Sequence, residues 1–407
     1  MLFYAILFVA FWALSLPSLR AKRESAGVVL LLSLVFVLVA GLRYETGYDW
    51  PVYHAAFDQT PDLFALLSGA ETDGPEASLM EPLFLGLMSL VKTLGGNVQA
   101  LFFVVALFNT IVLVRFLERA GARVALCMAI YFSWLYLSVQ MAVVRQSIAV
   151  SFLMLAVLAF DQRRPLKALA LMVAGSLFQF SLVMFAPIFA LGLWRKAFSI
   201  TSMIGRNKVR PVWIAILVAG CVLIGGVDTF WVLGEAAKFV SLPFIAEKLE
   251  VYMRFGPAEV SMTAIAYFAF NTAILAVLMR TYRPESRLDT MLLATIVMMI
   301  LAEGFLPNLP VIWNRFQYFG VVAQMVLLSR RLMALPAQRR LVEGAMVLGL
   351  SAVVFFRAVL SPSFLPYAPY QSYVEYVMTG DSGTGEDRSY RFTEAFQELA
   401  QKGLTVK

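Results

Sequence analysis

The sequence predicts an all-α protein, a polytopic bundle of membrane helices, and three observations support this fold class. Hydrophobic residues make up 60% of the 407 residues and charged residues only 14%, a balance too apolar for a soluble domain. Many apolar stretches approach the ~20 residues that a helix needs to cross the hydrocarbon core of a bilayer. The Lys and Arg residues lie in short clusters between these stretches, the distribution that orients a membrane protein.

Most of the apolar stretches predict single membrane spans. In chain order these are Leu2–Leu19, Gly27–Leu42, Val98–Leu117, Ala122–Val139, Val143–Phe160, Val212–Val227, Ser261–Met279, Leu288–Leu306, Val311–Leu328 and Val342–Leu360. Two stretches do not fit this scheme. Glu81–Leu94 is too short to cross comfortably, and Leu166–Trp194 is too long for one span and is interrupted around Gln179.

The basic clusters decide how these two stretches are treated, because cytoplasmic loops carry the excess of Lys and Arg. All clusters fall on one side only if residues 81–94 dip into the membrane and return, and if residues 166–194 cross and return as two short helices or a re-entrant pair. We therefore expect about twelve transmembrane or re-entrant helices, with both termini outside. The apolar run Leu2–Leu16 precedes its basic residues, opposite to a cleavable signal peptide, so it is expected to be a retained span.

One membrane domain over residues 1–360 is the simplest division of the chain. Its non-cytoplasmic side receives the loops 43–80 and 228–258, followed by a non-cytoplasmic tail, 361–407. The runs Val52–Leu67 and Phe230–Tyr252 are amphipathic and suit the membrane interface. The net charge of +7 comes from loop clusters and not from one patterned face, so nucleic acid is not an expected partner.

Several charged and polar residues at the ends of the predicted spans come out on the non-cytoplasmic side. They are Arg43, Asp49, Glu81, Arg145, Gln179, Ser181, Glu303, Asn308 and Arg315. An ionised side chain near hydrocarbon costs ~2.5–3.5 kcal/mol unless it faces protein, water or an opposite charge. Convergence in one polar site avoids that cost.

Arginines and carboxylates in such a site have complementary uses. The planar guanidinium binds phosphate oxygens in pairs, so two or three arginines can hold a pyrophosphate. A neighbouring carboxylate, Glu81 or Asp49, can accept a proton from a sugar hydroxyl. The alternative for each arginine is structural: it reaches the lipid headgroups or pairs with a carboxylate that holds two helices together. No ligand cluster predicts a metal, and Cys127 and Cys221 lie in apolar stretches where packing is the expected role.

The aromatic residues and the single histidine, His54, have simpler explanations. His54 lies in a predicted interfacial helix and favours a surface or hydrogen-bonding role. The Trp and Tyr residues near span ends are typical of an interfacial belt. Tyr48 and Trp50 remain candidates for stacking on a sugar ring.

Four motifs in order resemble the EpsG-like family of Wzy-type polysaccharide polymerases. They are Gly41–Trp50 with Tyr53, Glu81–Phe84, Val144–Ala149 and Asn314–Phe319, and the resemblance runs from about Arg43 to Tyr370. The chain departs from the family pattern at Gln179, where the family often has a histidine before x-Ser. Gln179 and Ser181 can still donate hydrogen bonds to a sugar or a phosphate.

The resemblance implies a fold like that of the C-type glycosyltransferases and a task in a bacterial inner membrane. That task is the joining of oligosaccharide repeat units, carried on undecaprenyl pyrophosphate, at the periplasmic face, without a cofactor or a metal. It implies that Arg145, Arg315 and Arg43 bind the pyrophosphate and that Glu81, or else Asp49, is the base. Tyr48, Trp50, Tyr53, Gln146, Gln179, Ser181, Asn314 and Tyr318 are the expected substrate-binding residues. Further partners are membrane lipids and, by the same resemblance, chain-length regulators and export proteins.

Two other classes of function remain open at this point. One is a flippase or other transporter of the same lipid-linked oligosaccharide, although the sequence lacks the paired broken helices in two related halves that such a protein would need. The other is a ligase or a membrane acyltransferase acting on surface polysaccharide. An acyltransferase would need a catalytic histidine in a span, and His54 is poorly placed for that role.

Overall fold

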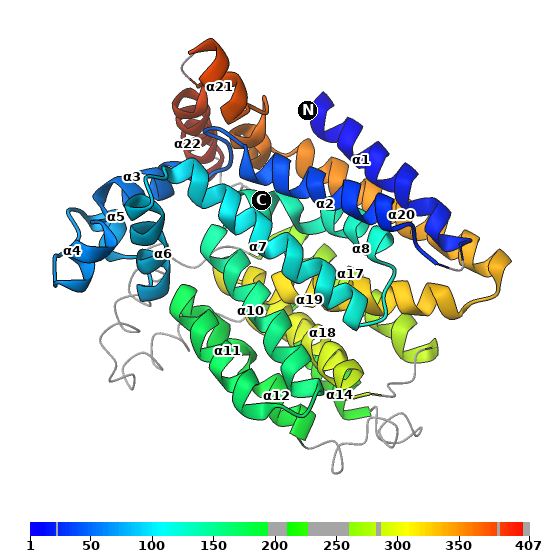
Figure 1. Ribbon diagram of the computed structural model, residues 1–407. Helices are drawn as coiled ribbons and strands as arrows, with labels where there is room; N and C mark the ends of the chain where they lie inside the picture. The colour runs from blue at the N-terminus through cyan, green and yellow to red at the C-terminus, as the bar shows by residue number, and fades with distance from the viewer. Residues whose placement is uncertain (22, 194–209, 227–259, 282–285, 381–382, 402–407) are drawn as a thin grey trace. The chain divides into compact units, whose positions relative to one another are not determined.

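The fold is a bundle of apolar helices, seen in a computed structural model that describes residues 1–21, 23–193, 210–226, 260–281, 286–380 and 383–401 (Figure 1). Within these ranges the secondary structure is helical, apart from one isolated bridge between Arg43 and Ser372. The chain forms two compact units. The first contains Met1–Ala186 and Met325–Lys402, and the second contains Pro187–Gln324.

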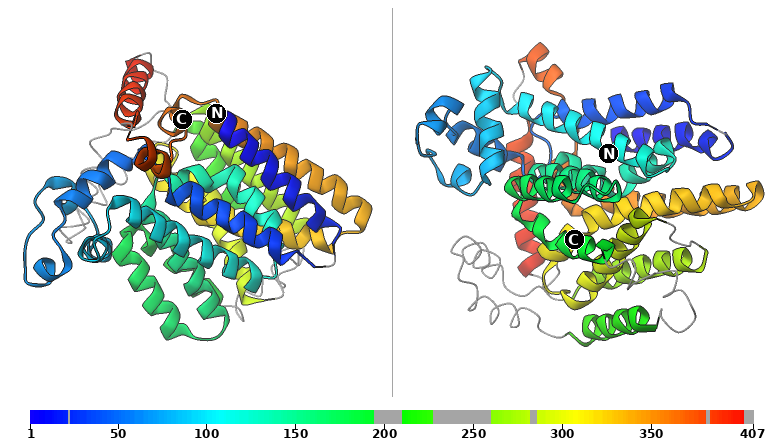
Figure 2. Two further views of the ribbon diagram at one scale, coloured as in Figure 1. Left: turned by 45° about the horizontal axis from the view of Figure 1, so that its top comes forward. Right: turned by 60° about the horizontal axis from the view of Figure 1, so that its bottom comes forward.

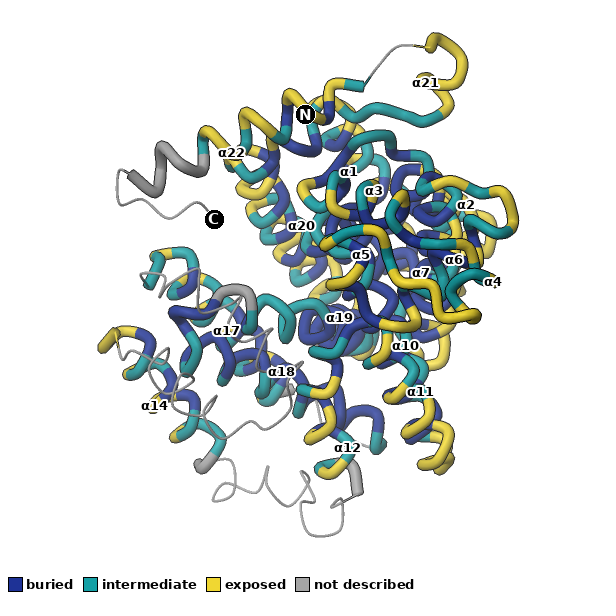
Figure 3. Tube along the Cα trace, turned by 90° about the vertical axis from the view of Figure 1, so that its left-hand side faces the viewer, coloured by how far each residue is buried: buried dark blue, intermediate teal, exposed yellow. Residues whose placement is uncertain are grey.

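Seven helices of the described residues are long and apolar enough to cross a membrane. Five shorter apolar helices accompany them: Ala26–Gly41, Pro82–Thr93, Pro165–Phe178, Phe180–Leu191 and Val212–Gly225. Large apolar side chains are exposed along several of these helices, for example Leu166, Leu169 and Val173 on the helix Pro165–Phe178. Figure 3 shows exposed positions (yellow) along this helix, labelled α11. Such exposure is unfavourable in water and expected in lipid. The predicted fold class, a polytopic membrane helix bundle, is confirmed.

The first unit consists of helices from both ends of the chain. They are α1 (Leu2–Ser15), α2 (Ala26–Gly41), α3 (Trp50–Gln59), α4 (Leu63–Leu67), α5 (Pro75–Ser78), α6 (Pro82–Thr93), α7 (Val98–Arg119), α8 (Val124–Tyr131), α9 (Leu137–Met141), α10 (Val144–Asp161), α11 (Pro165–Phe178), α20 (Ala337–Val359), α21 (Tyr373–Thr379) and α22 (Gly385–Gln401). The N-terminal α1 and the late α20 lie side by side (Figures 1 and 2), where Phe8 stacks on Phe355 at 4.8 Å between ring centroids.

The consecutive run α8, α9 and α10 is deeply buried. A π-helical turn, Phe132–Tyr136, joins α8 to α9, and all residues of α8 are buried. The backbone leaves the helical conformation at Val143, with ψ 67, and α10 begins at the next residue. Arg145 therefore lies in the first turn of α10, where the main-chain N–H groups have no partner within the helix.

The interruption expected within residues 166–194 is present. The helix α11 ends at Phe178, and Gln179 is extended with φ −157 and ψ 108. A 3-10 helix, Phe180–Phe185, follows and packs back onto α11. This return is possible because Gly175 has no side chain: a Cβ there would lie 2.4 Å from Leu182.

The C-terminal tail packs on the loop that follows α2. Tyr373 N donates to Leu42 O at 2.7 Å, and Tyr44 N donates to Gln371 O at 2.9 Å. Further along the loop, Gly47 N donates to the carbonyl of Pro366 at 3.0 Å, a residue of the 3-10 helix Pro362–Tyr367. The loop of the first predicted motif is thus bound by a segment more than 300 residues later in the chain.

The second unit contains α14 (Arg210–Gly225), α17 (Met262–Thr281), α18 (Arg287–Phe305) and the first part of α19 (Pro310–Ala334). Gly304 allows α14 and α18 to pack closely, since a Cβ at Gly304 would lie 2.6 Å from Ala219 Cβ. The predicted loop 228–258 and its amphipathic run lie outside the described residues. The proposed orientation in the membrane, the dipping of residues 81–94 and the domain division at residue 360 stay predictions.

Gly47 provides a test of the packing between the loop and α9. It has φ +103, and an added Cβ would lie 2.3 Å from Met141 O. We expect Gly47→Ala to lose about 1–3 kcal/mol through the left-handed backbone and a further ~1–3 kcal/mol through overpacking. The measurement is the midpoint of thermal unfolding in detergent micelles.

Gly69→Ala is the matched control. Its φ is +92, but no atom lies within 4 Å of the added Cβ, so it carries the backbone cost without the clash. Equal melting temperatures for the two variants would show that the contact with Met141 does not constrain the loop.

Candidate functional site

An ion pair between Glu81 and Arg145 forms the centre of the candidate site. Arg145 Nη1 donates to Glu81 Oε2 at 2.6 Å and to the carbonyl of Leu79 at 3.3 Å. The Glu81 residue is only 1% exposed, while the Arg145 side chain keeps 23% of its surface accessible. Of the two partners, Arg145 is therefore the more accessible to an incoming ligand.

Local sequence and packing both place Glu81 opposite α10. Glu81 is the extended residue before α6, and Pro82 at the first helical position fixes the start of that helix. One hydrophobic cluster joins α3, α6, α7 and α10, through residues such as Tyr53, Phe84, Phe102 and Ile148. The carboxylate is thus held by a packed core and not by a surface loop.

The 3-10 helix after α11 contributes the second edge of the site. Phe180 N lies 3.5 Å from Glu81 Oε1, a long hydrogen bond. Ser181 Oγ donates to Gln146 Oε1 at 2.8 Å, and Gln179 is buried. The structure therefore brings together Glu81, Arg145, Gln146 and Ser181. They come from two of the predicted motifs and from the predicted interruption around Gln179, which lie far apart in the sequence.

Tyr53 connects α3 to the ion pair. Its Oη accepts a hydrogen bond from the main-chain N–H of Arg145 at 3.4 Å, one of the N–H groups left unpaired at the start of α10. Burial raises the pKa of the Tyr53 phenol, so the hydroxyl stays neutral at physiological pH and keeps its proton for donation.

Arg43 lies in a different environment from Arg145. It is 2% exposed; Nη1 donates to Ala40 O and, at 3.4 Å, to Gln140 O, and the guanidinium lies 4.1 Å from the centroid of the Phe102 ring. Burial lowers the pKa of Arg43 to about 10, so it remains charged at neutral pH. These contacts tie the end of α2 to α7 and α9, and a direct role of Arg43 with pyrophosphate stays a prediction.

A buried polar network connects the surroundings of Arg43 to α10. Asn109 Nδ2 donates to Gln140 Oε1 at 3.3 Å and to Ser147 Oγ at 2.8 Å. Ser151 Oγ donates to Asn109 Oδ1 at 2.7 Å. Because unpaired polar groups are costly in an apolar interior, this network fixes the rotation of α10 and with it the position of Arg145.

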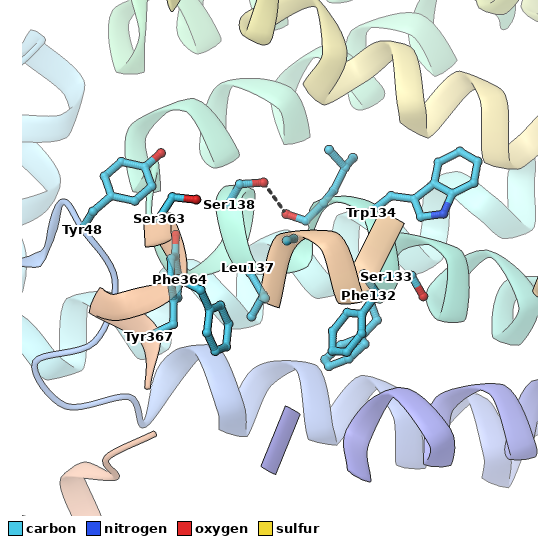
Figure 4. A pocket seen from close by; sticks show the side chains of 12 residues that line it. Tyr48, Phe132, Ser133, Trp134, Leu137, Ser138, Ser363, Phe364 and Tyr367 are labelled. Carbon is cyan, nitrogen blue, oxygen red and sulfur yellow. Dashed lines mark hydrogen bonds between the residues drawn. The ribbon is translucent and has the colours of Figure 1, made fainter. Parts of the chain in front are cut away.

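The three predicted residues at the start of α3 face different surroundings. Tyr48 lines a cavity of about 160 Å³ together with Phe132, Ser363 and Tyr367 (Figure 4). Ser138, also in this cavity, donates to the carbonyl of Leu135 at 3.0 Å. Asp49 is half-buried directly before α3, and Trp50 lines a second cavity.

The remaining predicted residues, Asn314, Arg315 and Tyr318, belong to the second unit and are half-buried on α19. Their convergence with Arg145 stays a prediction. Within this unit, Glu303 Oε1 accepts hydrogen bonds from Asn271 Nδ2 at 2.7 Å and from Gln317 Nε2 at 2.8 Å. Gln324 Nε2 donates to Asn271 Oδ1 at 2.8 Å, so the buried carboxylate belongs to an amide network.

Arg388 was not anticipated from the sequence. It is 6% exposed, and its guanidinium donates to Glu45 O at 2.8 Å, Gln371 Oε1 at 2.7 Å and Pro369 O at 2.7 Å. The surrounding tail is polar and gives no signal of burial. Only the contact with the loop 43–50, visible in three dimensions, reveals this role.

The helices and the buried arginine–carboxylate pair define a polytopic membrane protein with a polar site inside its helical bundle. A comparison with protein families matches residues 28–372 of the chain to the EpsG family. The chain belongs to the EpsG family, a Wzy-like polysaccharide polymerase family. Searches of curated proteins and of solved structures each found no match.

A double-mutant cycle tests whether the ion pair holds α6 against α10. Removing one partner of a buried pair leaves an uncompensated charge and costs about 3–5 kcal/mol. We therefore expect Glu81→Gln and Arg145→Met each to lower the free energy of unfolding in detergent. The double variant should recover part of this loss, with a coupling energy of about 0.5–3 kcal/mol.

The Arg331–Glu343 ion pair of the same unit is the control. The Glu343 side chain is 27% exposed against 2% for Glu81, so Glu343→Gln should cost less. Strict additivity of the two site variants would contradict a direct coupling between Glu81 and Arg145.

Proposed function

We propose that the protein joins oligosaccharide repeat units carried on undecaprenyl pyrophosphate, by glycosyl transfer at the periplasmic face of a bacterial inner membrane. The membership of the EpsG family supports the class of reaction. The single observation that carries the proposal is the Glu81–Arg145 pair, because it places a guanidinium that can donate hydrogen bonds to phosphate oxygens beside a carboxylate that can accept a proton.

Arg145 is the proposed ligand of the leaving pyrophosphate. Its fork matches paired phosphate oxygens, and its side chain keeps 23% of its surface accessible. Negative charge on the pyrophosphate increases as the sugar–phosphate bond breaks, so the cation stabilises the transition state more than the bound substrate.

Glu81 is the proposed general base. The ion pair with Arg145 makes the Glu81 carboxylate a weaker proton acceptor, because the guanidinium occupies one of its oxygens. When the pyrophosphate binds Arg145, the ion pair weakens, and the carboxylate becomes a better proton acceptor. The attacking sugar hydroxyl then forms a bond to the anomeric carbon and passes its proton to Glu81, while the bond to pyrophosphate breaks and its electron pair leaves with the phosphate oxygen.

Other predicted residues take supporting roles in this proposal. Gln146 and Ser181, hydrogen-bonded to each other, can exchange this bond for bonds to sugar hydroxyls or phosphate oxygens. Arg43 is proposed to position α2, α7 and α9 around the site, as its buried contacts favour. Asp49 is the second candidate base, and Arg315, with Asn314 and Tyr318, completes the phosphate and sugar contacts in the proposal.

The decisive experiment incubates purified protein with lipid-linked repeat units and separates the products on a gel. The wild-type protein should give a ladder of polymer lengths. Glu81→Gln should reduce the rate of ladder formation by about 10²–10⁴-fold, the usual contribution of a general base, and Arg145→Ala should leave single repeat units. A transporter of the same substrate would instead keep its flux in the Glu81→Gln variant.

Glu343→Gln is the matched control for these variants. It also removes a carboxylate from an ion pair with an arginine, Arg331, but outside the site, and its ladder should equal that of the wild type. A normal ladder from the folded Arg145→Ala protein would overturn the proposed pyrophosphate contact.

A further inference from the structure

A second cavity of the first unit lies between the loop after α2 and the tail helix α21. Its volume is about 230 Å³, and its walls include Tyr44, Trp50, Phe102, Tyr373 and Tyr376. This volume is below the ~300–1,000 Å³ of pockets that hold drug-sized ligands. The cavity therefore fits a small ring or one segment of a longer chain.

The aromatic wall of this cavity comes from both ends of the sequence. Tyr44 stacks on Tyr376 with 4.3 Å between ring centroids and 16° between planes. Tyr373 lies 6.0 Å from Tyr44 and 5.9 Å from Tyr376. Flat aromatic faces bind the C–H faces of sugar rings, and their few rotatable bonds keep the entropic cost of ordering low.

The polar side chains of the cavity include carboxylates, amides and the imidazole of His54. Glu45, Asp58 and Asn97 line it, and none of its lining residues is a lysine or an arginine. Asp58 and His54 form a contact of 3.2 Å with side chains 65% and 53% exposed, so both can exchange this contact for a ligand hydroxyl. The carboxylates of Glu45 and Asp58 repel a phosphate group and favour an uncharged ligand rich in hydroxyl groups.

An adjoining cavity of about 330 Å³ shares Tyr44 and Tyr376 and adds Gln371, Glu375 and Thr384. The stacked tyrosines therefore contribute to both cavities. A chain of linked sugars can place one ring in each cavity and keep contact with the same aromatic pair.

Arg388 holds the two halves of this wall together. It donates to the carbonyl of Glu45 at 2.8 Å, and Gly385 N donates to Glu45 Oε2 at 2.9 Å. Glu45 has φ 46, a left-handed backbone that is unfavourable for a non-glycine residue. The tail thus fixes a strained loop residue and aligns Tyr44 with Tyr376.

We propose that these adjoining cavities bind sugar rings of the lipid-linked substrate, as a saccharide subsite completed by the C-terminal segment. This inference rests on the proposed polymerase function, which supplies the sugar chain. In this proposal the two chemical parts of the substrate bind at different places. The pyrophosphate binds at Arg145, and the hydroxyl-rich sugar rings bind at the tyrosine wall.

The test uses full-length protein in detergent micelles and a lipid-free probe. The probe is the oligosaccharide repeat unit released by mild acid from the lipid-linked pool of the producing cells. Its affinity is measured by isothermal titration calorimetry. Tyr376→Ala and Tyr44→Ala should each weaken binding about 5–10-fold, the effect expected from losing one aromatic contact, while Tyr376→Phe should bind normally.

Tyr390→Ala is the matched control, because Tyr390 lies on α22, is 65% exposed and lines neither cavity. Unchanged affinity of the folded Tyr376→Ala protein for the probe would overturn the subsite. The gel ladder of the same variant distinguishes failure of the subsite from failure of the polymerase function. If Arg145→Ala abolishes the ladder and Tyr376→Ala leaves it unchanged, the subsite is rejected and the polymerase function is retained. If the wild-type protein forms no ladder but binds the probe, and Tyr376→Ala weakens that binding, the polymerase function is rejected and the saccharide site is retained.

Discussion

The arrangement of the first unit depends on the cost of placing a charge in an apolar interior. Glu81 is almost completely buried, and the guanidinium of Arg145, at 2.6 Å, offsets its charge. An unpaired buried carboxylate would lose several kcal/mol of hydration, so α6 and α10 must stay together. The cluster around Tyr53 and Phe84 then fills the space that this pair defines.

The same constraint gives the two arginines different roles. Arg145 pairs with one carboxylate and its side chain remains partly accessible, so it can exchange partners. Arg43 is enclosed by main-chain carbonyls and the face of Phe102, and moving it toward a ligand would expose several polar groups to an apolar interior. Of the arginines in the first and third motifs, Arg145 is thus suited to exchange its partner for a ligand, and Arg43 is suited to hold the surrounding helices rigidly.

Much of this organisation could be predicted from the sequence. The interruption at Gln179 was visible as polar residues in an otherwise apolar stretch, and the helix beginning after Glu81 was marked by the following proline. The pairing of Glu81 with Arg145 was also among the expected alternatives, since intramembrane charges seek opposite charges. The burial of Arg43 was not predictable, because it depends on Gln140 and Phe102, which come close only after α7 and α9 have packed. Arg388 could not be found for the same reason: 343 positions separate it from Glu45.

The attachment of the tail has a consequence for the order in which the molecule matures. A chain leaves the ribosome with its N-terminal part first, so the loop of residues 43–50 reaches the membrane long before Arg388 is synthesised. Until then Glu45 has no partner to hold its left-handed backbone, and the two tyrosine faces cannot meet. The aromatic wall can therefore form only after the tail around Arg388 has been made, long after the synthesis of Glu81 and Arg145.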